Sequence, residues 1–177
     1  MRNWYIFRAL RGSDPARLAR EAAAVPGCGA YVPTFTRQQD YVDDGEHLLV
    51  DQVYPALPGS LFVQADAAGL SRVEAAFAGR ALLCRDAVGR PCAVPDETVV
   101  LIKYALHCGG GEVRFLPALD GRLCSGGLAC IADGPLAGVR GYVKRIRKDR
   151  KFLVPIGSYS LLMLPRNLWN PAGTVLA

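Results

Sequence analysis

The chain has 177 residues, of which 51% are hydrophobic, and this is enough for one large or two small domains with a real core. No apolar run reaches transmembrane length and the first residues do not resemble a signal peptide, so we expect a cytoplasmic protein without a membrane contact. The six cysteines form no CxxC pair and the two histidines lie far apart, so we expect neither a metal site nor a cofactor.

The charge is divided unevenly along the chain. Residues 1–108 contain 11 Lys and Arg against 12 Asp and Glu, a net charge of −1, whereas residues 109–177 contain 10 against 4, a net charge of +6. We therefore expect two modules, and we expect the second to meet an anionic partner.

The first module alternates predicted strands and helices. Aromatic and β-branched residues predict a strand over 3–10, and Ser13 or Asp14 can cap the helix that follows, with Pro15 in its first turn. A later helix begins at the acidic pair Asp96-Glu97, which suits a helix N-terminus, and ends near residue 108. The other predicted elements are strands at 30–36, 60–64 and 81–84, an acidic hairpin tip at 43–46 and a short helix at 70–77. This order predicts an α+β fold that opens with an α/β plait.

The second module is predicted to be a small β-barrel. Three glycines at 109–111 follow a helix and lack the Lys-Ser/Thr pair of a phosphate loop, so they predict a linker over 108–120. In the turn at 133–136, Leu136 would plug the barrel, while Gly138 and Gly141 mark places where the backbone bends and passes close to another segment. The predicted strands are 128–131, 142–146, 152–155 and 158–164, with residues 167–169 closing the barrel.

The segment 131–143, IADGPLAGVRGYV, resembles a KOW motif, the hairpin that opens a small SH3-like barrel. Two other landmarks precede it in the order found in the NusG family. Trp4-Tyr5 opens the first strand and is followed by Arg11-Gly12, and the segment 54–63, YPALPGSLFV, is similar to the family's F-P-x-Y-L-F-V segment. The Pro-Ala-Leu-Pro variant and the stretch 141–147 are more similar to the specialised antiterminators RfaH and UpxY than to housekeeping NusG.

The resemblance implies an N-terminal NGN domain over 1–107, an α/β plait, followed by a linker over 108–120 and a KOW domain over 121–177. It implies a monomeric, operon-specific transcription elongation and antitermination factor. The NGN domain would bind the clamp helices of the RNA polymerase β′ subunit, reach the β lobe, touch the non-template DNA and suppress pausing and termination. The KOW domain would contact RNA, a ribosomal protein or another factor.

The sequence also bears on two other classes of function. A KOW-type RNA-binding or ribosome-associated protein would use its basic C-terminal hairpin as the principal site. An enzyme is not expected, because the sequence contains no phosphate loop, nucleophile elbow or metal-ligand cluster.

The resemblance also implies two sets of site residues in the first module. The polymerase pocket would contain Ile6, Leu57, Phe62 and Ile102, with Ser60 standing where an aromatic residue is usual. Such hydrophobic residues are more often simply core, and this alternative stays open. The DNA-facing residues would be Arg11, Arg17 and Arg80, for which ordinary surface arginines are the alternative.

The third candidate site is the segment 140–151 of the second module, which holds seven basic residues and one acid. Seven like charges at one edge of a small barrel repel each other, and phosphates would relieve that repulsion. A solubilising hairpin tip is the alternative. The residues predicted to bind RNA or another partner are Arg140, Lys144, Arg145, Arg147, Lys148, Arg150 and Lys151.

Overall fold

The structure is a computed structural model that describes residues 2–44, 46–109, 113–117, 127–130, 138–146, 149–156 and 159–163. Its N-terminal part consists of β1 (Asn3–Ala9), α1 (Pro15–Ala24), β2 (Gly29–Tyr31), β3 (Thr34–Asp43), β4 (Glu46–Pro55), β5 (Ser60–Ala65), α2 (Ala67–Ala76), β6 (Ala81–Leu83), β7 (Ala93–Val94) and α3 (Asp96–Gly109). Its C-terminal part consists of β8 (Arg114–Pro117), β9 (Gly127–Cys130), β10 (Arg140–Ile146), β11 (Asp149–Ile156) and β12 (Tyr159–Met163).

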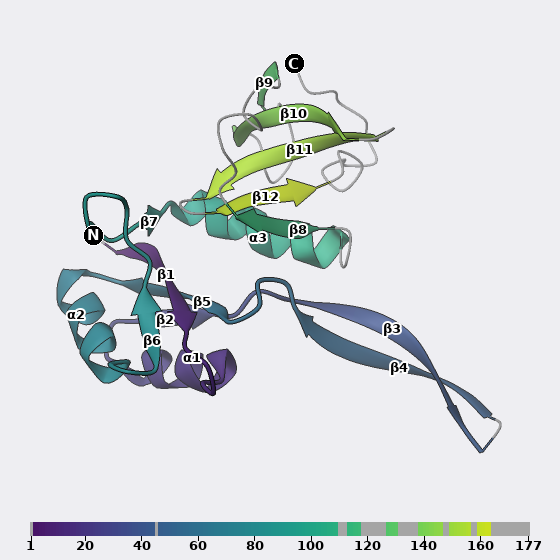
Figure 1. Cartoon of the computed structure of the whole chain (residues 1–177), viewed down its shortest axis with the longest axis horizontal. Coiled ribbons are helices and arrows are strands. Elements are labelled where there is room, and N and C mark those ends of the chain that lie inside the picture. The colour runs from purple at the N-terminus through teal and green to yellow at the C-terminus, as the bar shows by residue number, and fades with distance from the viewer. Residues whose placement is uncertain are drawn as a thin grey trace.

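Within these residues the fold is α+β with antiparallel sheets, and this part of the prediction is confirmed. Figure 1 shows α3 between an N-terminal sheet, which carries α1 and α2 on its other side, and a C-terminal sheet. In the part of the chain that the structure describes, no helix is long and apolar enough to cross a membrane.

The N-terminal sheet has the strand order β2-β5-β1-β6, and β7 also pairs with β1. Phe7 lies opposite Leu61 and Ile6 lies opposite Phe62. Because side chains alternate across a strand, these two pairs face opposite sides of the sheet. Accordingly, Phe7 and Leu61 belong to the apolar cluster that includes residues of α1 and α2, whereas Ile6 and Phe62 belong to a different cluster that includes α3.

The helix starts follow from their capping residues. Of the two predicted caps for α1, the structure uses Asp14, whose carboxylate accepts hydrogen bonds from the backbone N–H groups of Ala16 and Arg17. Helix α2 begins at Ala67, three residues before the predicted start, because the Asp66 carboxylate accepts from the N–H of Gly69 and fixes the first turn there.

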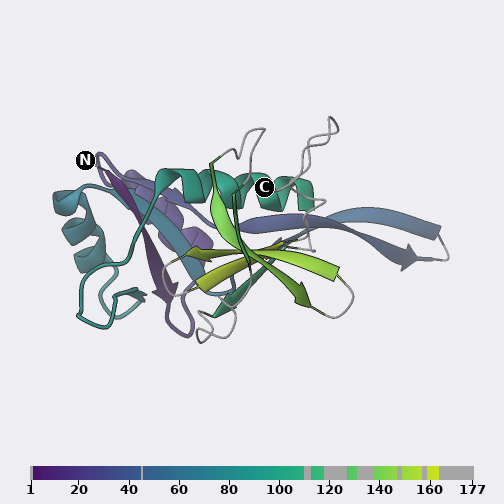
Figure 2. The ribbon, with the colours of Figure 1, turned by 90° about the horizontal axis from the view of Figure 1, so that it is seen from above.

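The strand predicted at 30–36 is divided in the structure. β2 ends at Tyr31 and β3 begins at Thr34, since Pro33 has no N–H with which to continue a ladder. β3 and β4 then form a separate two-stranded ribbon of ten residue pairs, which turns between Asp43 and Glu46 as predicted. Figures 1 and 2 both show this ribbon extending away from the rest of the chain.

The C-terminal strands form an antiparallel sheet in the order β8-β12-β11-β10-β9. This path is open, so the described strands do not make the closed barrel that the sequence predicted. The predicted turn at 133–136 and the closing segment 167–169 lie outside the described residues. The stretch 108–120, predicted to be a linker, contains the end of α3 and strand β8. The division into domains stays a prediction.

One apolar cluster spans both parts of the chain, and α3 joins them. Val99, Ile102 and Leu106 follow one another at helical spacing on one side of α3, while Leu101 and Ala105 occupy the adjacent side. All five are buried. The same cluster contains Trp4, Ile6 and Phe62 from the N-terminal sheet and Phe152, Val154, Ile156 and Leu161 from the C-terminal sheet.

The N-terminal end of α3 is fastened to β1 by a polar contact. The indole Nε1 of Trp4 donates a hydrogen bond to the Asp96 carboxylate at 2.6 Å. Two turns further along α3, Lys103 Nζ lies 5.3 Å from the centre of the Trp4 ring and 5.0 Å from that of the Tyr31 ring. These contacts orient the helix across the sheet.

Gly141 of β10 lies where the backbone passes close to β11, as the sequence predicted. A Cβ at this position would collide with the Leu153 carbonyl oxygen and the Phe152 ring. Gly29 of β2 offers the contrast, because a Cβ there would only touch Gln64 at ordinary van der Waals distance.

We therefore expect Gly141→Ala to lower the free energy of unfolding by about 1–3 kcal/mol, the usual effect of overpacking. Gly29→Ala is the matched control and should leave stability nearly unchanged. Urea unfolding of both variants measures the difference. Equal effects of the two substitutions would contradict the close approach of β10 to β11.

Candidate partner-binding site and basic surfaces

The four residues predicted for the polymerase pocket come together in the structure. Ile6 lies on β1, Phe62 on β5, Ile102 on α3 and Leu57 in the loop between β4 and β5, and all four belong to the cluster that α3 shares between the sheets. All four are also buried: Leu57 is 6% exposed and the other three are 0% exposed. Their surface is therefore covered in this state of the chain.

The loop that carries Leu57 is held in place by backbone hydrogen bonds at both ends. The N–H of Ala56 donates to the Pro33 carbonyl at 2.8 Å, and the N–H of Ala9 donates to the Gly59 carbonyl at 2.7 Å. Gly59 has a φ of +70°, which a residue with a side chain would adopt only with strain. The loop thereby keeps Leu57 buried in the shared cluster.

Ser60 is a polar residue in this apolar surrounding. It is 1% exposed, and in the structure its hydroxyl has no hydrogen-bond partner. An unpaired buried hydroxyl is unfavourable by about 1–3 kcal/mol. Ser60 is the first residue of β5, where it lies opposite Arg8 and beside the loop that carries Leu57. The resemblance implies an aromatic residue at this position. Ser60 is smaller and polar, so this edge of the cluster differs from the one that the resemblance implies.

A cavity of about 330 Å³, which the sequence did not indicate, lies where α3 meets the base of the ribbon. Its walls include Tyr31, Phe35, Lys103 and His107. Burial raises the pKa of the Tyr31 hydroxyl to about 12, so this group stays protonated at neutral pH. Only the three-dimensional meeting of α3 with β2 and β3 forms this site, and no spacing along the chain predicts it.

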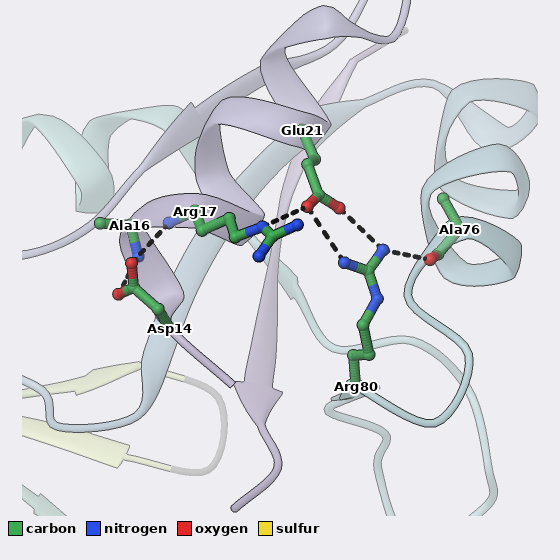
Figure 3. Close-up of polar contacts among 6 residues, drawn as sticks. All are labelled: Asp14, Ala16, Arg17, Glu21, Ala76 and Arg80. Carbon is green, nitrogen blue, oxygen red and sulfur yellow. Dashed lines mark hydrogen bonds and ion pairs between the residues drawn. The ribbon is translucent and has the colours of Figure 1, made fainter. Parts of the chain in front are cut away.

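Two of the three predicted DNA-facing arginines converge on one carboxylate (Figure 3). Arg80 contacts Glu21 at 2.7 Å, and Arg17 contacts it at 3.3 Å across one turn of α1. The hydrogen bond from Arg80 lowers the pKa of Glu21, and Arg17 adds to this effect. Arg11 lies in the turn after Leu10, whose N–H donates to the Arg80 carbonyl. Arg17 and Arg80 thus share Glu21, which partly neutralises them, while Arg11 lies next to the backbone contact between Leu10 and Arg80.

The basic hairpin consists of β10 and β11, which pair through their backbones. Lys144 lies opposite Lys151, and Arg145 lies opposite Arg150, in the pairing of β10 with β11. The backbone register thus places basic residues of the two strands opposite one another. Arg140 is exposed at the start of β10 and Lys151 is half-buried, whereas Arg147 and Lys148 lie outside the described residues.

The described residues offer no group of three His, Cys, Asp or Glu side chains placed to hold a metal ion. Cys28, Cys84 and Cys92 form no disulfide and are half-buried. Burial raises the pKa of the Cys28 and Cys84 thiols, which keeps them in the less reactive protonated form.

Comparison with known proteins does not assign the chain to a family: no family model matches it, and no curated protein gives a significant match.

Glu21→Gln should free Arg17 and Arg80 for an anion, so we expect it to raise the affinity for single-stranded DNA. The slope of log K against log salt should steepen by up to about one unit, as for one added phosphate contact. Glu74→Gln is the control, because Glu74 pairs with Arg85 at 2.6 Å elsewhere on the surface. Equal affinities of the two variants, by fluorescence anisotropy, would contradict a role for the arginine cluster.

The same variant tests the lowered pKa of Glu21. A carboxylate with a lowered folded-state pKa stabilises the protein above its unfolded-state pKa, and this stabilisation is lost as the pH falls through the folded-state pKa. Melting temperatures of wild type and Glu21→Gln should therefore differ near neutral pH and converge in acid.

Proposed function

We propose that this protein is an operon-specific transcription elongation and antitermination factor of the NusG kind. Its N-terminal part acts as an NGN domain that binds the clamp helices of RNA polymerase β′ and the non-template DNA, and its C-terminal part acts as a KOW domain. The protein works by binding, holding the polymerase clamp closed so that pausing and termination are suppressed. The β lobe is a further contact in this proposal.

One observation carries the proposal. The four residues that the resemblance implies for the pocket are separated by up to 96 positions in the sequence (6 to 102), and yet they join one apolar cluster around the Leu57 loop and α3. A partner helix binds most readily to a surface of this kind, where apolar side chains from several elements lie together.

Binding at this site requires the cluster to open. Ile6, Leu57, Phe62 and Ile102 are buried together with Phe152, Val154, Ile156 and Leu161 of the C-terminal sheet. In this proposal the C-terminal sheet moves off α3, which loosens the packing of α3 on the N-terminal sheet and lets a partner helix reach the four residues. The apparent affinity for the partner then equals the affinity of the open form multiplied by the fraction of chains that are open.

The arginine cluster supplies the proposed DNA contact. Arg11 and Arg17 are exposed, and Arg80 is half-exposed beside them. Contacts of this kind with phosphates carry no sequence information and weaken steeply with salt. Operon specificity in this proposal therefore resides in a contact other than the arginine-phosphate pairs.

A second candidate function is a KOW-type RNA-binding or ribosome-associated protein. The observation that favours it is the pairing of Lys144 with Lys151 and of Arg145 with Arg150 across β10 and β11. Two adjacent like-charged pairs in one hairpin favour a polyanion, and a structured RNA provides one.

The test is binding of the full chain to purified core RNA polymerase, with three variants. Leu57→Ala should weaken binding at least about tenfold, or about 1.4 kcal/mol. Leu70→Ala is its control, because Leu70 is 7% exposed and buried in the other cluster, against 6% for Leu57. Both substitutions remove a buried leucine and should lower stability by a similar amount, but only the first touches the proposed pocket.

Leu161→Ala should act in the opposite direction. Leu161 is fully buried on β12, a strand that contacts α3, and its truncation weakens the covered state. Its polymerase affinity should therefore exceed that of the wild type. Absence of polymerase binding by the wild type and by Leu161→Ala at micromolar concentration would overturn the proposal, and RNA binding by the same proteins would then favour the second candidate.

A further inference from the structure

The ribbon formed by β3 and β4 is an unpartnered structure. Its two strands pair only with each other in the described part of the chain. At its base, the rings of Phe35 and Tyr54 stack with their centres 5.6 Å apart, and Phe35 packs against the shared cluster. Beyond the base every side chain described from residue 36 to 42 and from 46 to 53 is exposed.

The outer part of the ribbon carries apolar side chains on both faces. Residues directly opposite in an antiparallel pair share a face, so Tyr41 and Leu48 lie together on one side and Val42 lies on the other. The exposed apolar residues are Tyr41 at 59%, Val42 at 58%, Leu48 at 46%, Leu49 at 71%, Val50 at 44% and Val53 at 66%. By the same alternation, Tyr41, Leu48 and Val50 form one face, and Val42, Leu49 and Val53 form the other.

A two-stranded ribbon with exposed apolar faces gains little stability from its own contacts. A two-stranded hairpin is marginally stable in water, and exposed strand edges with large apolar side chains promote association with other chains. Few polar contacts reinforce the described outer part; one is the hydrogen bond between His47 Nδ1 and the Asp40 carboxylate at 2.9 Å. The exposed apolar side chains are therefore accounted for by a partner that covers both faces.

The charge of the ribbon defines the chemistry of that partner. Residues 34–55 contain five acidic residues and one arginine, which gives a net charge of −4. The acids are Asp40, Asp43, Asp44, Glu46 and Asp51. A segment with this charge repels the phosphate backbone of nucleic acid and attracts a surface rich in Lys and Arg.

We propose that the β3–β4 ribbon is a docking arm for a second protein, and that it inserts into a groove with apolar walls and a basic rim. Tyr41, Leu48 and Val50 contact one wall of the groove, and Val42, Leu49 and Val53 contact the other. Asp40 and Asp51 lie on the face of Val42, Leu49 and Val53 and meet the basic rim beside that wall. This site is separate from the Leu57 pocket and does not depend on the proposed polymerase function, although polymerase itself is one protein that can carry such a groove.

The test uses the full chain with a photo-crosslinking residue at Leu48 or at Leu49, which face opposite sides of the ribbon. Val88 is the control position, because it is an exposed apolar residue, at 77%, on another loop. Crosslinking is done in the cells that make the protein, and mass spectrometry identifies the crosslinked peptides. We expect both ribbon positions to capture one protein, in peptides that contain Lys or Arg, and position 88 not to capture it.

The captured protein is then purified and its affinity for the full chain is measured. Leu49→Ser and the double variant Asp40→Asn with Asp51→Asn should each weaken binding about tenfold or more, whereas Val88→Ser should not change it. Crosslinks from the ribbon to nucleic acid or to a second copy of this chain, the absence of a crosslink, or unchanged affinity of the ribbon variants would overturn the inference.

Failure of this inference and failure of the proposed function give different results. If core polymerase binding responds to Leu57→Ala and no ribbon position captures a protein, the polymerase proposal stands and the docking arm does not. If polymerase does not bind and both ribbon positions capture another protein, the reverse holds.

Discussion

Helix α3 has to bury two adjacent sides, and the rest of the structure is arranged around that constraint. Its residues Val99, Ile102 and Leu106 lie on one side, while Leu101 and Ala105 lie on the next. A single sheet can cover only one such stripe, so the helix needs a second layer, and the C-terminal sheet provides it. Burial of each valine, leucine or isoleucine side chain is favourable by roughly 1.5–3 kcal/mol. The two parts of the chain are thereby coupled through one shared core.

The same coupling gives the protein a way to control its proposed partner contact. In the proposal, partner binding to Leu57 and Ile102 loosens the shared cluster, so it is coupled to the release of the C-terminal sheet from α3. The arginines around Glu21 and the acidic ribbon have no such restriction, since both are exposed in the covered state. A partner can therefore contact these outer surfaces first, and the release of the C-terminal sheet can follow as a separate step.

Local signals predicted the local structure well. Asp14 with Pro15 and the strands β1 and β5 were readable from the sequence because neighbouring residues determine them, and Gly141 marked a close approach. The pocket and arginine sets came from a resemblance; in the structure the four pocket residues share one cluster, and Arg17 and Arg80 share Glu21. It did not predict strand β8, the length of the ribbon, the covering of Leu57 or the contact of Arg80 with Glu21, 59 positions apart. Each of these depends on contacts between distant segments, for which a single sequence contains no local pattern.

Hydrogen exchange of the full chain with and without core RNA polymerase tests the central claim most directly. If the C-terminal sheet leaves the shared cluster when the polymerase binds, amides of β11 and β12 should exchange faster in the complex, while amides of the Leu57 loop and of α3 should be protected. Protection of the Leu57 loop with no change in β11 and β12 would show that the polymerase binds without opening the cluster. Unchanged exchange in both regions would show that the pocket is not the binding site, and either result would contradict the account.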